Sequence, residues 1–220
     1  MDSWLESFAE TNFRRSSDTA HDLKTPLNVA VLNLELLRMR VSKLAGGDDP
    51  KVNGYAKSIE LELRRMARIF DAFFVLSTPP RADEAITVVD LSALCMETAA
   101  DASLAIAPIG SSFTISCHES RIRQAFTLFF EGISHVFTAE DREAEVEKTP
   151  DQFSLSVRAH PLAGDFEVTK IFKFYYTDPR GNPDLSLASA RLIAETYGGE
   201  LIAVEERDKV VIRLSFPGQS

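Results

Sequence analysis

Two runs of apolar residues, each spaced alternately by four and three positions, constrain the first third of this 220-residue chain. Such spacing places side chains on one stripe of an α-helix and predicts two long amphipathic helices. Between the runs, residues 45–50 read Ala-Gly-Gly-Asp-Asp-Pro, and two glycines and a proline end the first helix there. The apolar positions are Leu23, Leu27, Ala30, Leu34, Leu37, Val41 and Leu44 in the first run, and Val52, Ala56, Ile59, Leu63, Met66, Phe70 and Phe73 in the second.

Two long helices joined by a short loop form an antiparallel hairpin with one apolar stripe on each arm. Because two arms alone leave much of that apolar surface in water, we expect a homodimer in which two hairpins form a four-helix bundle. The alternative is a monomeric hairpin that packs on the C-terminal part of its own chain.

The sequence changes texture after Thr78-Pro79-Pro80, since proline cannot continue the second helix. We therefore expect one domain at residues 1–80 and another at 81–220. Strands and helices mix in the second, so the chain is predicted to be α+β, with a sheet covered by helices on one face. Strands are expected at 86–89, 113–116, 153–158, 168–176, 200–204 and 209–216, helices at 91–102, 119–137 and 187–197, a cap at Gly198-Gly199, and a solvated loop or frayed helix end at 140–148.

The charge of the chain excludes several classes of partner. Its net charge is -9, and residues 81–220 hold the whole deficit, with twenty-two acids and thirteen bases. Such a surface repels nucleic acid and anionic membrane.

The sequence has no apolar run near the roughly 20 residues that cross a bilayer, no signal peptide at its start, and two cysteines without metal-like spacing. We expect a soluble cytoplasmic protein.

A histidine stands in the run His-Asp-Leu-Lys-Thr-Pro-Leu-Asn at positions 21–28, on the first predicted helix. His21 is two residues from Leu23, about 200° around the helix, so its ring is expected to face solvent. An imidazole with the ordinary histidine pKa of about 6.5 offers a neutral nitrogen as a nucleophile toward phosphorus. Asp22 can hydrogen-bond the other ring N–H, and Pro26 loosens the helical turn. A surface histidine without function leaves the proline and the adjacent acid unexplained.

This run resembles the phospho-acceptor box of the sensor histidine kinases. The resemblance implies that His21 accepts phosphate, that Asp22 assists the transfer, and that Thr25 takes part in any phosphatase activity toward a response regulator. Pro26 is expected to act structurally. From position 14 to 43 six bases face three acids, which suits a receiver domain with an acidic phosphate pocket. We expect partner docking at Arg14, Arg15, Lys24 and Asn28.

The resemblance continues more weakly through residues 81–220 and implies an α/β sandwich like a histidine-kinase ATPase domain. Leu128 and Gly132 stand where the family has asparagines that ligate magnesium, and neither side chain carries an oxygen. Asp178 matches the adenine-binding aspartate of the family. Pro179 and Arg180 follow it in place of a tandem-glycine turn.

The phosphate loop departs from the family as well. Asp184 and Ser186 replace the glycines of Gly-Leu-Gly-Leu-Ala, whose backbone N–H groups close on phosphates in the family. Only a few residues separate Gly181 from Leu187, where kinases carry a long flexible lid. We therefore expect no bound ATP, no other cofactor and no metal of the chain's own, with Mg²⁺ supplied by the partner receiver domain.

These features predict a homodimeric histidine phosphotransferase of a two-component phosphorelay, a pseudokinase that carries a phosphoryl group on His21 between receiver-domain aspartates. It would be a phosphoryl-transfer protein and not an autonomous ATP-dependent kinase. Two alternatives stay open. One is a diverged ATP-dependent sensor histidine kinase, and the other is a non-catalytic regulator that binds a receiver or a kinase.

Overall fold

The computed structural model describes residues 27–44, 46–47, 49–77 (backbone alone for 71–77), 85–162, 166–173, 176–182 and 184–218. The chain divides into two compact units, Met1–Pro79 and Pro80–Ser220, and each is described by itself. Among the described residues, no helix is both long enough and apolar enough to span a membrane.

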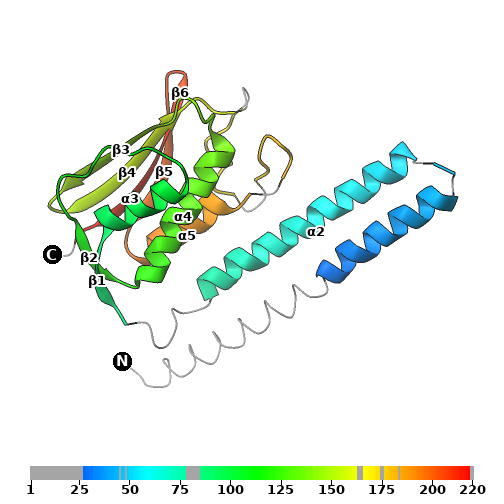
Figure 1. Ribbon diagram of the computed structural model, residues 1–220, viewed down its shortest axis with the longest axis horizontal. Coiled ribbons are helices and arrows are strands. Elements are labelled where there is room, and N and C mark those ends of the chain that lie inside the picture. Colours follow the sequence, from blue (N-terminus) through cyan, green and yellow to red (C-terminus); the bar gives the residue numbers. More distant parts are fainter. Residues whose placement is uncertain are drawn as a thin grey trace. The chain divides into compact units, whose positions relative to one another are not determined.

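The first unit is an antiparallel helical hairpin (Figure 1), formed by helical residues 27–44 and by α2 (Pro50–Ser77). Gly46 in the turn has a φ of 71°, a left-handed conformation that glycine adopts without strain. Asp49 caps the N-terminus of α2: its Oδ1 accepts a hydrogen bond of 2.8 Å from the backbone N–H of Lys51. Pro50 follows at the first helical position, where no backbone donor is needed. The predicted hairpin is confirmed.

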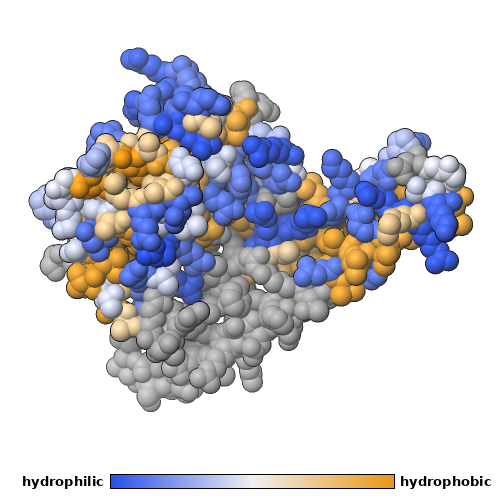
Figure 2. Space-filling view, in the orientation of Figure 1, coloured by the Kyte–Doolittle hydropathy of each residue, from blue (hydrophilic) through white to orange (hydrophobic). Residues whose placement is uncertain are grey.

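The two arms cover only part of their apolar stripes in the single chain. Leu27 and Ala56 are buried at 9% and 8% exposure. Figure 2 shows hydrophobic side chains gathered along the hairpin. Four positions of the predicted stripes, here named the uncovered seam, stay between 46% and 80% exposed: Leu37, Leu44, Ile59 and Met66.

The described residues of the second unit form a four-stranded antiparallel sheet, a separate two-stranded ribbon and three helices (Figure 1). The large sheet has the order β3-β4-β6-β5, and the ribbon pairs β1 with β2. The elements are β1 (Thr87–Asp90), α3 (Leu91–Asp101), β2 (Thr114–Cys117), α4 (Glu119–Val136), β3 (Glu143–Thr149), β4 (Gln152–Ala159), α5 (Ser186–Thr196), β5 (Glu200–Glu206) and β6 (Lys209–Pro217). The predicted α+β class is confirmed, although two sheets replace the expected single one.

The core of this unit lies between the large sheet and its helices. Phe126 of α4 packs edge-to-face on Phe153 of β4 and Phe216 of β6, with ring centroids 6.1 and 5.9 Å apart. All three side chains are fully buried. Gly199 lets α5 turn back closely, since a Cβ there would lie 2.2 Å from the backbone oxygen of Ser215. The predicted cap is confirmed, because Gly198 has a φ of 74° and the N–H of Gly199 bonds the carbonyl of Ala194.

Two predicted elements are wrong. The acidic stretch 140–148 is not a loop, because residues 143–149 form β3, paired with β4 over its whole length. Its odd-numbered side chains are exposed, so the glutamates are solvated on an edge strand. The stretch 168–176 is not a strand: its described residues 168–173 form turns, in which the N–H of Lys170 bonds the carbonyl of Glu167 and that of Lys173 bonds Lys170.

Candidate functional site

The catalytic, docking and structural residues that the sequence predicts for phosphate transfer mostly lie outside the described residues. They are His21, Asp22, Thr25, Arg14, Arg15, Lys24 and Pro26. Asn28 alone is described, and its side chain is exposed one residue after buried Leu27. The roles of these residues therefore stay predictions.

The two positions that the sequence resemblance aligns with magnesium-ligating asparagines lie on α4. Leu128 is half-buried, and Gly132 is buried against α5. A Cβ at Gly132 would stand 2.5 Å from Cγ of Leu187 and 2.8 Å from its Cδ2. Leu187 is itself 2% exposed. The leucine side chain thus occupies the space where a side chain at position 132 would have to lie.

Asp178 is buried at 7% exposure and serves its own loop. Its Oδ1 accepts a hydrogen bond of 2.7 Å from the backbone N–H of Asn182, and its Oδ2 accepts a longer one, 3.4 Å, from the Asn182 side chain. The N–H of Asp178 in turn bonds the carbonyl of Asn182 at 2.8 Å. Gly181 completes the turn with a φ of 84°. The carboxylate therefore holds a tight loop at residues 178–182.

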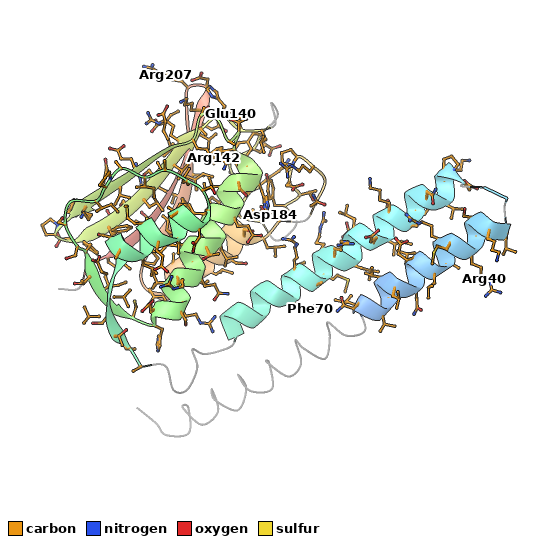
Figure 3. All side chains as sticks on the ribbon, in the orientation of Figure 1. Arg40, Phe70, Glu140, Arg142, Asp184 and Arg207 are labelled. Carbon is orange, nitrogen blue, oxygen red and sulfur yellow. The ribbon has the colours of Figure 1, made fainter. Side chains whose placement is uncertain are left out.

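Asp184 lies just before α5 and beside α4 (Figure 3). It is 3% exposed, and its Oδ1 accepts hydrogen bonds from the backbone N–H and the hydroxyl of Ser186, at 2.9 and 2.7 Å. Its Oδ2 lies 3.1 Å from Nδ1 of His135, in the last turn of α4. A buried carboxylate is thus matched by one amide, one hydroxyl and one imidazole.

The ionisation of this cluster follows from its contacts. The contact with Asp184 is the main reason why the pKa of His135 is raised, with Glu131 and Asp178 adding to it. Burial works against the charge of Asp184, yet the contacts with His135 and Ser186 hold its pKa below the ordinary value. Burial raises the pKa of Tyr176 to about 12, helped by Asp184 and Asp178. The cluster thus places an imidazole with a raised pKa against a carboxylate with a lowered pKa, near the phenol of Tyr176.

Sequence reasoning named Asp178, Asp184 and Ser186 but gave His135 no role. A signal was present, because His135 follows Gly132 by three residues on one helix and so shares its face. The pattern alone did not show that this face meets the start of α5.

A second histidine is flanked by carboxylates at the end of β4. Nδ1 of His160 contacts Asp141, and its Nε2 lies 3.1 Å from Oδ2 of Asp208. The contact with Asp141, followed by that with Asp208, raises the pKa of His160. The hydrogen bond from Thr138, followed by those from His160, lowers the pKa of Asp141. These side chains tie together the α4–β3 loop, the end of β4 and the β5–β6 turn.

Comparisons with known proteins agree with this architecture. Residues 14–80 match the His Kinase A (phospho-acceptor) domain. The Acinetobacter baumannii histidine kinase AdeS superposes with a TM-score of 0.54 at 15% identity, over 91% of this chain and 98% of that one. Full-length ShkA, solved in complex with AMPPNP, superposes with a TM-score of 0.53 at 15% identity. That match covers 94% of this chain but only 46% of ShkA, so this chain spans less than half of its length. No curated protein sequence matches the chain.

At these identities the structural likeness shows the fold. The predicted plan is confirmed: a helical hairpin followed by a domain with the fold of a histidine-kinase ATPase domain. The phospho-acceptor domain match includes position 21. Together these findings show that residues 14–80 are similar to a phospho-acceptor domain and that the chain has the fold of histidine kinases.

Proposed function

We propose that the chain is a histidine phosphotransferase that carries a phosphoryl group on His21 between the aspartates of receiver domains. The observation that carries this proposal is the buried Asp184 carboxylate, which stands where the resembling kinases have a phosphate-binding glycine loop. A phospho-acceptor domain then has no phosphate donor within its own chain, and another protein must supply the phosphate.

Two further observations support the loss of ATP binding. Leu187 fills the space beside Gly132, where the family's second magnesium-ligating asparagine would stand. Asp178 was the best sequence argument for a working kinase, but its carboxylate oxygens accept hydrogen bonds from Asn182. An adenine amine would have to compete with that loop for the same carboxylate.

The transfer itself needs little from the protein besides a positioned nucleophile. A neutral nitrogen of His21 attacks the phosphorus of an aspartyl phosphate on the donor receiver domain. A nitrogen–phosphorus bond forms, and the bond from phosphorus to the carboxylate oxygen breaks. Asp22 hydrogen-bonds the other ring nitrogen and stabilises the positive charge, while Mg²⁺ held by the receiver stabilises the phosphoryl oxygens. The reverse steps deliver the group to a second aspartate.

Docking uses the first helix in this proposal. Arg14 and Arg15 precede the phospho-acceptor run in the sequence, and Lys24 and Asn28 belong to it. Farther along the same helix, Arg40 and Lys43 are exposed. Basic and amide side chains suit the acidic rim of a receiver's phosphate pocket. Thr25 has the position from which the family assists hydrolysis of the phosphorylated receiver.

The same unit is proposed to form a homodimer. The uncovered seam is a set of large apolar side chains that one hairpin leaves in water. Burying it against a second copy completes a four-helix bundle and removes that apolar area from water. The exposed Tyr55 lies four residues from Ile59 and widens the same face.

One experiment tests the proposal. The purified chain is mixed with phosphorylated receiver domains and, separately, with labelled Mg-ATP. We expect label on His21 from the receivers, none from ATP, and no receiver-to-receiver flow in His21→Ala. Phosphate flow that persists in His21→Ala excludes phosphotransfer and leaves a non-catalytic binding role. Labelling of His21 from ATP identifies a kinase.

A further inference from the structure

We propose that the start of α5 is sealed by an anion of the chain itself, with the Asp184 carboxylate in the place where a helix of this kind holds a ligand phosphate. This inference deepens the proposed loss of nucleotide binding and rests on it only for the comparison with kinases. It is independent of the chemistry at His21.

The first step is the position of Asp184 relative to the helix. The N-terminus of an α-helix carries unpaired N–H groups and a partial positive charge, which together attract anions. Leu185, the residue that caps α5, has no side chain able to accept these N–H groups. Asp184 provides that acceptor, because its Oδ1 binds both the backbone N–H and the hydroxyl of Ser186. The first N–H group of the helix therefore already has an anionic acceptor from the chain itself.

The second step is the burial of this carboxylate. A charged group at 3% exposure needs hydrogen bonds and an opposite charge to compensate for the water it loses. Ser186 provides the hydrogen bonds, and His135 lies 3.1 Å from Oδ2. Since His135 belongs to α4, the ion pair also joins α4 to the start of α5. The contact between α4 and the start of α5 is therefore made without a bound ligand.

The third step is the charge that an incoming anion would meet. Glu131 and Asp178 also act on His135, and both, like Asp184, raise its pKa. Tyr176 stays neutral near pH 7, because burial and the same acids raise its pKa to about 12. His135 is thus in contact with Asp184, and the negative charges of Glu131 and Asp178 act on the same imidazole. A phosphate entering this space is repelled while Asp184 remains.

Removing the carboxylate tests the proposal without any nucleotide. Asp184→Gly restores the residue that kinases carry and leaves the α5 terminus and His135 without their anion. In the full chain we expect this variant to melt several degrees below the wild type, and millimolar inorganic phosphate to restore most of that loss. Wild type should show no more shift with phosphate than with sodium chloride of equal ionic strength. Asp208→Gly is the matched control, since it removes a carboxylate from His160 but belongs to the β5–β6 turn and not to the start of a helix.

Direct binding is followed by NMR on the same samples. Phosphate should shift the amide resonances of Ser186 and Leu187 in Asp184→Gly and leave them unmoved in wild type. Equal stabilisation of wild type and Asp184→Gly by phosphate, or an Asp184→Gly variant as stable as wild type, overturns the seal. If Asp184→Gly does not fold, Asp184→Asn provides the test, because asparagine has the shape of aspartate without its negative charge. The pKa of His135 measured by NMR must then fall, and an unchanged value overturns the proposal.

These outcomes separate the two proposals. Failure of the phosphate rescue leaves transfer through His21 intact, because that reaction is measured with receiver domains. Loss of receiver-to-receiver transfer in His21→Ala leaves the seal intact.

Discussion

The side chain of Leu187 lies in the space that a Cβ on Gly132 would enter, with its Cγ 2.5 Å from the position of that atom. Both residues are buried between α4 and α5. The helices approach closely because one position has no side chain and the other fills the gap. This contact decides what substitution at either position can do.

Gly132→Asn, which installs the family's residue, should destabilise the second unit by about 1–3 kcal/mol, because the new side chain overlaps Leu187. Urea unfolding followed by circular dichroism measures the effect. The control is Leu128→Asn at the other asparagine position, which is half-buried and should cost less. Adding Leu187→Ala to Gly132→Asn should recover part of the loss. A Gly132→Asn variant as stable as wild type contradicts the packing described.

The stability of the second unit should depend on pH through His135. Its pKa is raised in the folded state, so its contribution is fully present below the ordinary value of 6.5 and is lost as pH rises through the raised value. The lowered pKa of Asp184 acts at the other end: that contribution is present above 3.8 and is lost as pH falls through the folded value. Stability from this pair is greatest between these limits.

His135→Gln should therefore flatten the decline in unfolding free energy above about pH 6.5. The change should not exceed roughly 1 kcal/mol, since the ring is partly solvated and water screens the pair. Urea unfolding at intervals from pH 5 to 9 measures it. His160 has a raised pKa as well, so His160→Gln removes a separate part of the same decline. If the unfolding free energy of His135→Gln depends on pH in the same way as that of wild type, the contribution assigned to the His135–Asp184 pair is contradicted.

Leu37→Lys should convert the proposed dimer into monomers, because it puts a charge into the uncovered seam. Light scattering after gel filtration should give half the mass of wild type. Leu32→Lys is the control: Leu32 is 61% exposed and Leu37 59%, yet the two positions lie about 140° apart around the helix. A dimer that survives Leu37→Lys and dissociates in Leu32→Lys would place the interface on the other face.

Gly199→Ala should destabilise the second unit by about 1–3 kcal/mol, since its Cβ would meet the Ser215 oxygen at 2.2 Å. The same substitution at Gly54 serves as its control. No atom lies within 4 Å of a Cβ there, and the position is inside α2. Gly54→Ala should therefore stabilise the hairpin by roughly 0.5–1 kcal/mol through helix propensity. Thermal unfolding compares the two, and a neutral Gly199→Ala would contradict the close approach of α5 to β6.

Local sequence patterns predicted the elements that are specified by residues close together in the chain. The four-three spacing before and after residues 45–50 specified the hairpin, and Gly198-Gly199 specified the end of α5. Each signal depends only on residues that are near one another in the sequence, so neither requires knowledge of a distant contact. The residues Asp184 and Ser186 also predict the absence of a phosphate loop, and that absence stays a prediction.

The misassigned segments depended on distant partners. Residues 143–149 alternate glutamate with other residues, and glutamate has low strand propensity. Pairing with β4 and the solvent exposure of the glutamate side chains accommodate it. Residues 168–173 include β-branched and aromatic side chains but form turns. There Ile171 is buried, and the ring of Phe172 lies 5.3 Å from the Arg191 guanidinium of α5. Tertiary contacts overrode local preference in both segments.

The partner of Asp184 was missed for a similar reason. Its closeness to His135 depends on how α4 and α5 pack, and that packing depends on Gly132 and Leu187. The pattern of one helix cannot specify the contact between two. The residues at 14, 15, 21, 22, 24, 25 and 26 lie outside the described residues, so their roles stay predictions.

The Gly132–Leu187 contact also limits how such a chain can change over generations. An asparagine at position 132 overlaps the Leu187 side chain unless that side chain moves, and a smaller residue at 187 leaves a cavity while glycine remains at 132. Either single change costs stability before any magnesium ligand is gained. A stable exchange at either position therefore requires a matching substitution at the other.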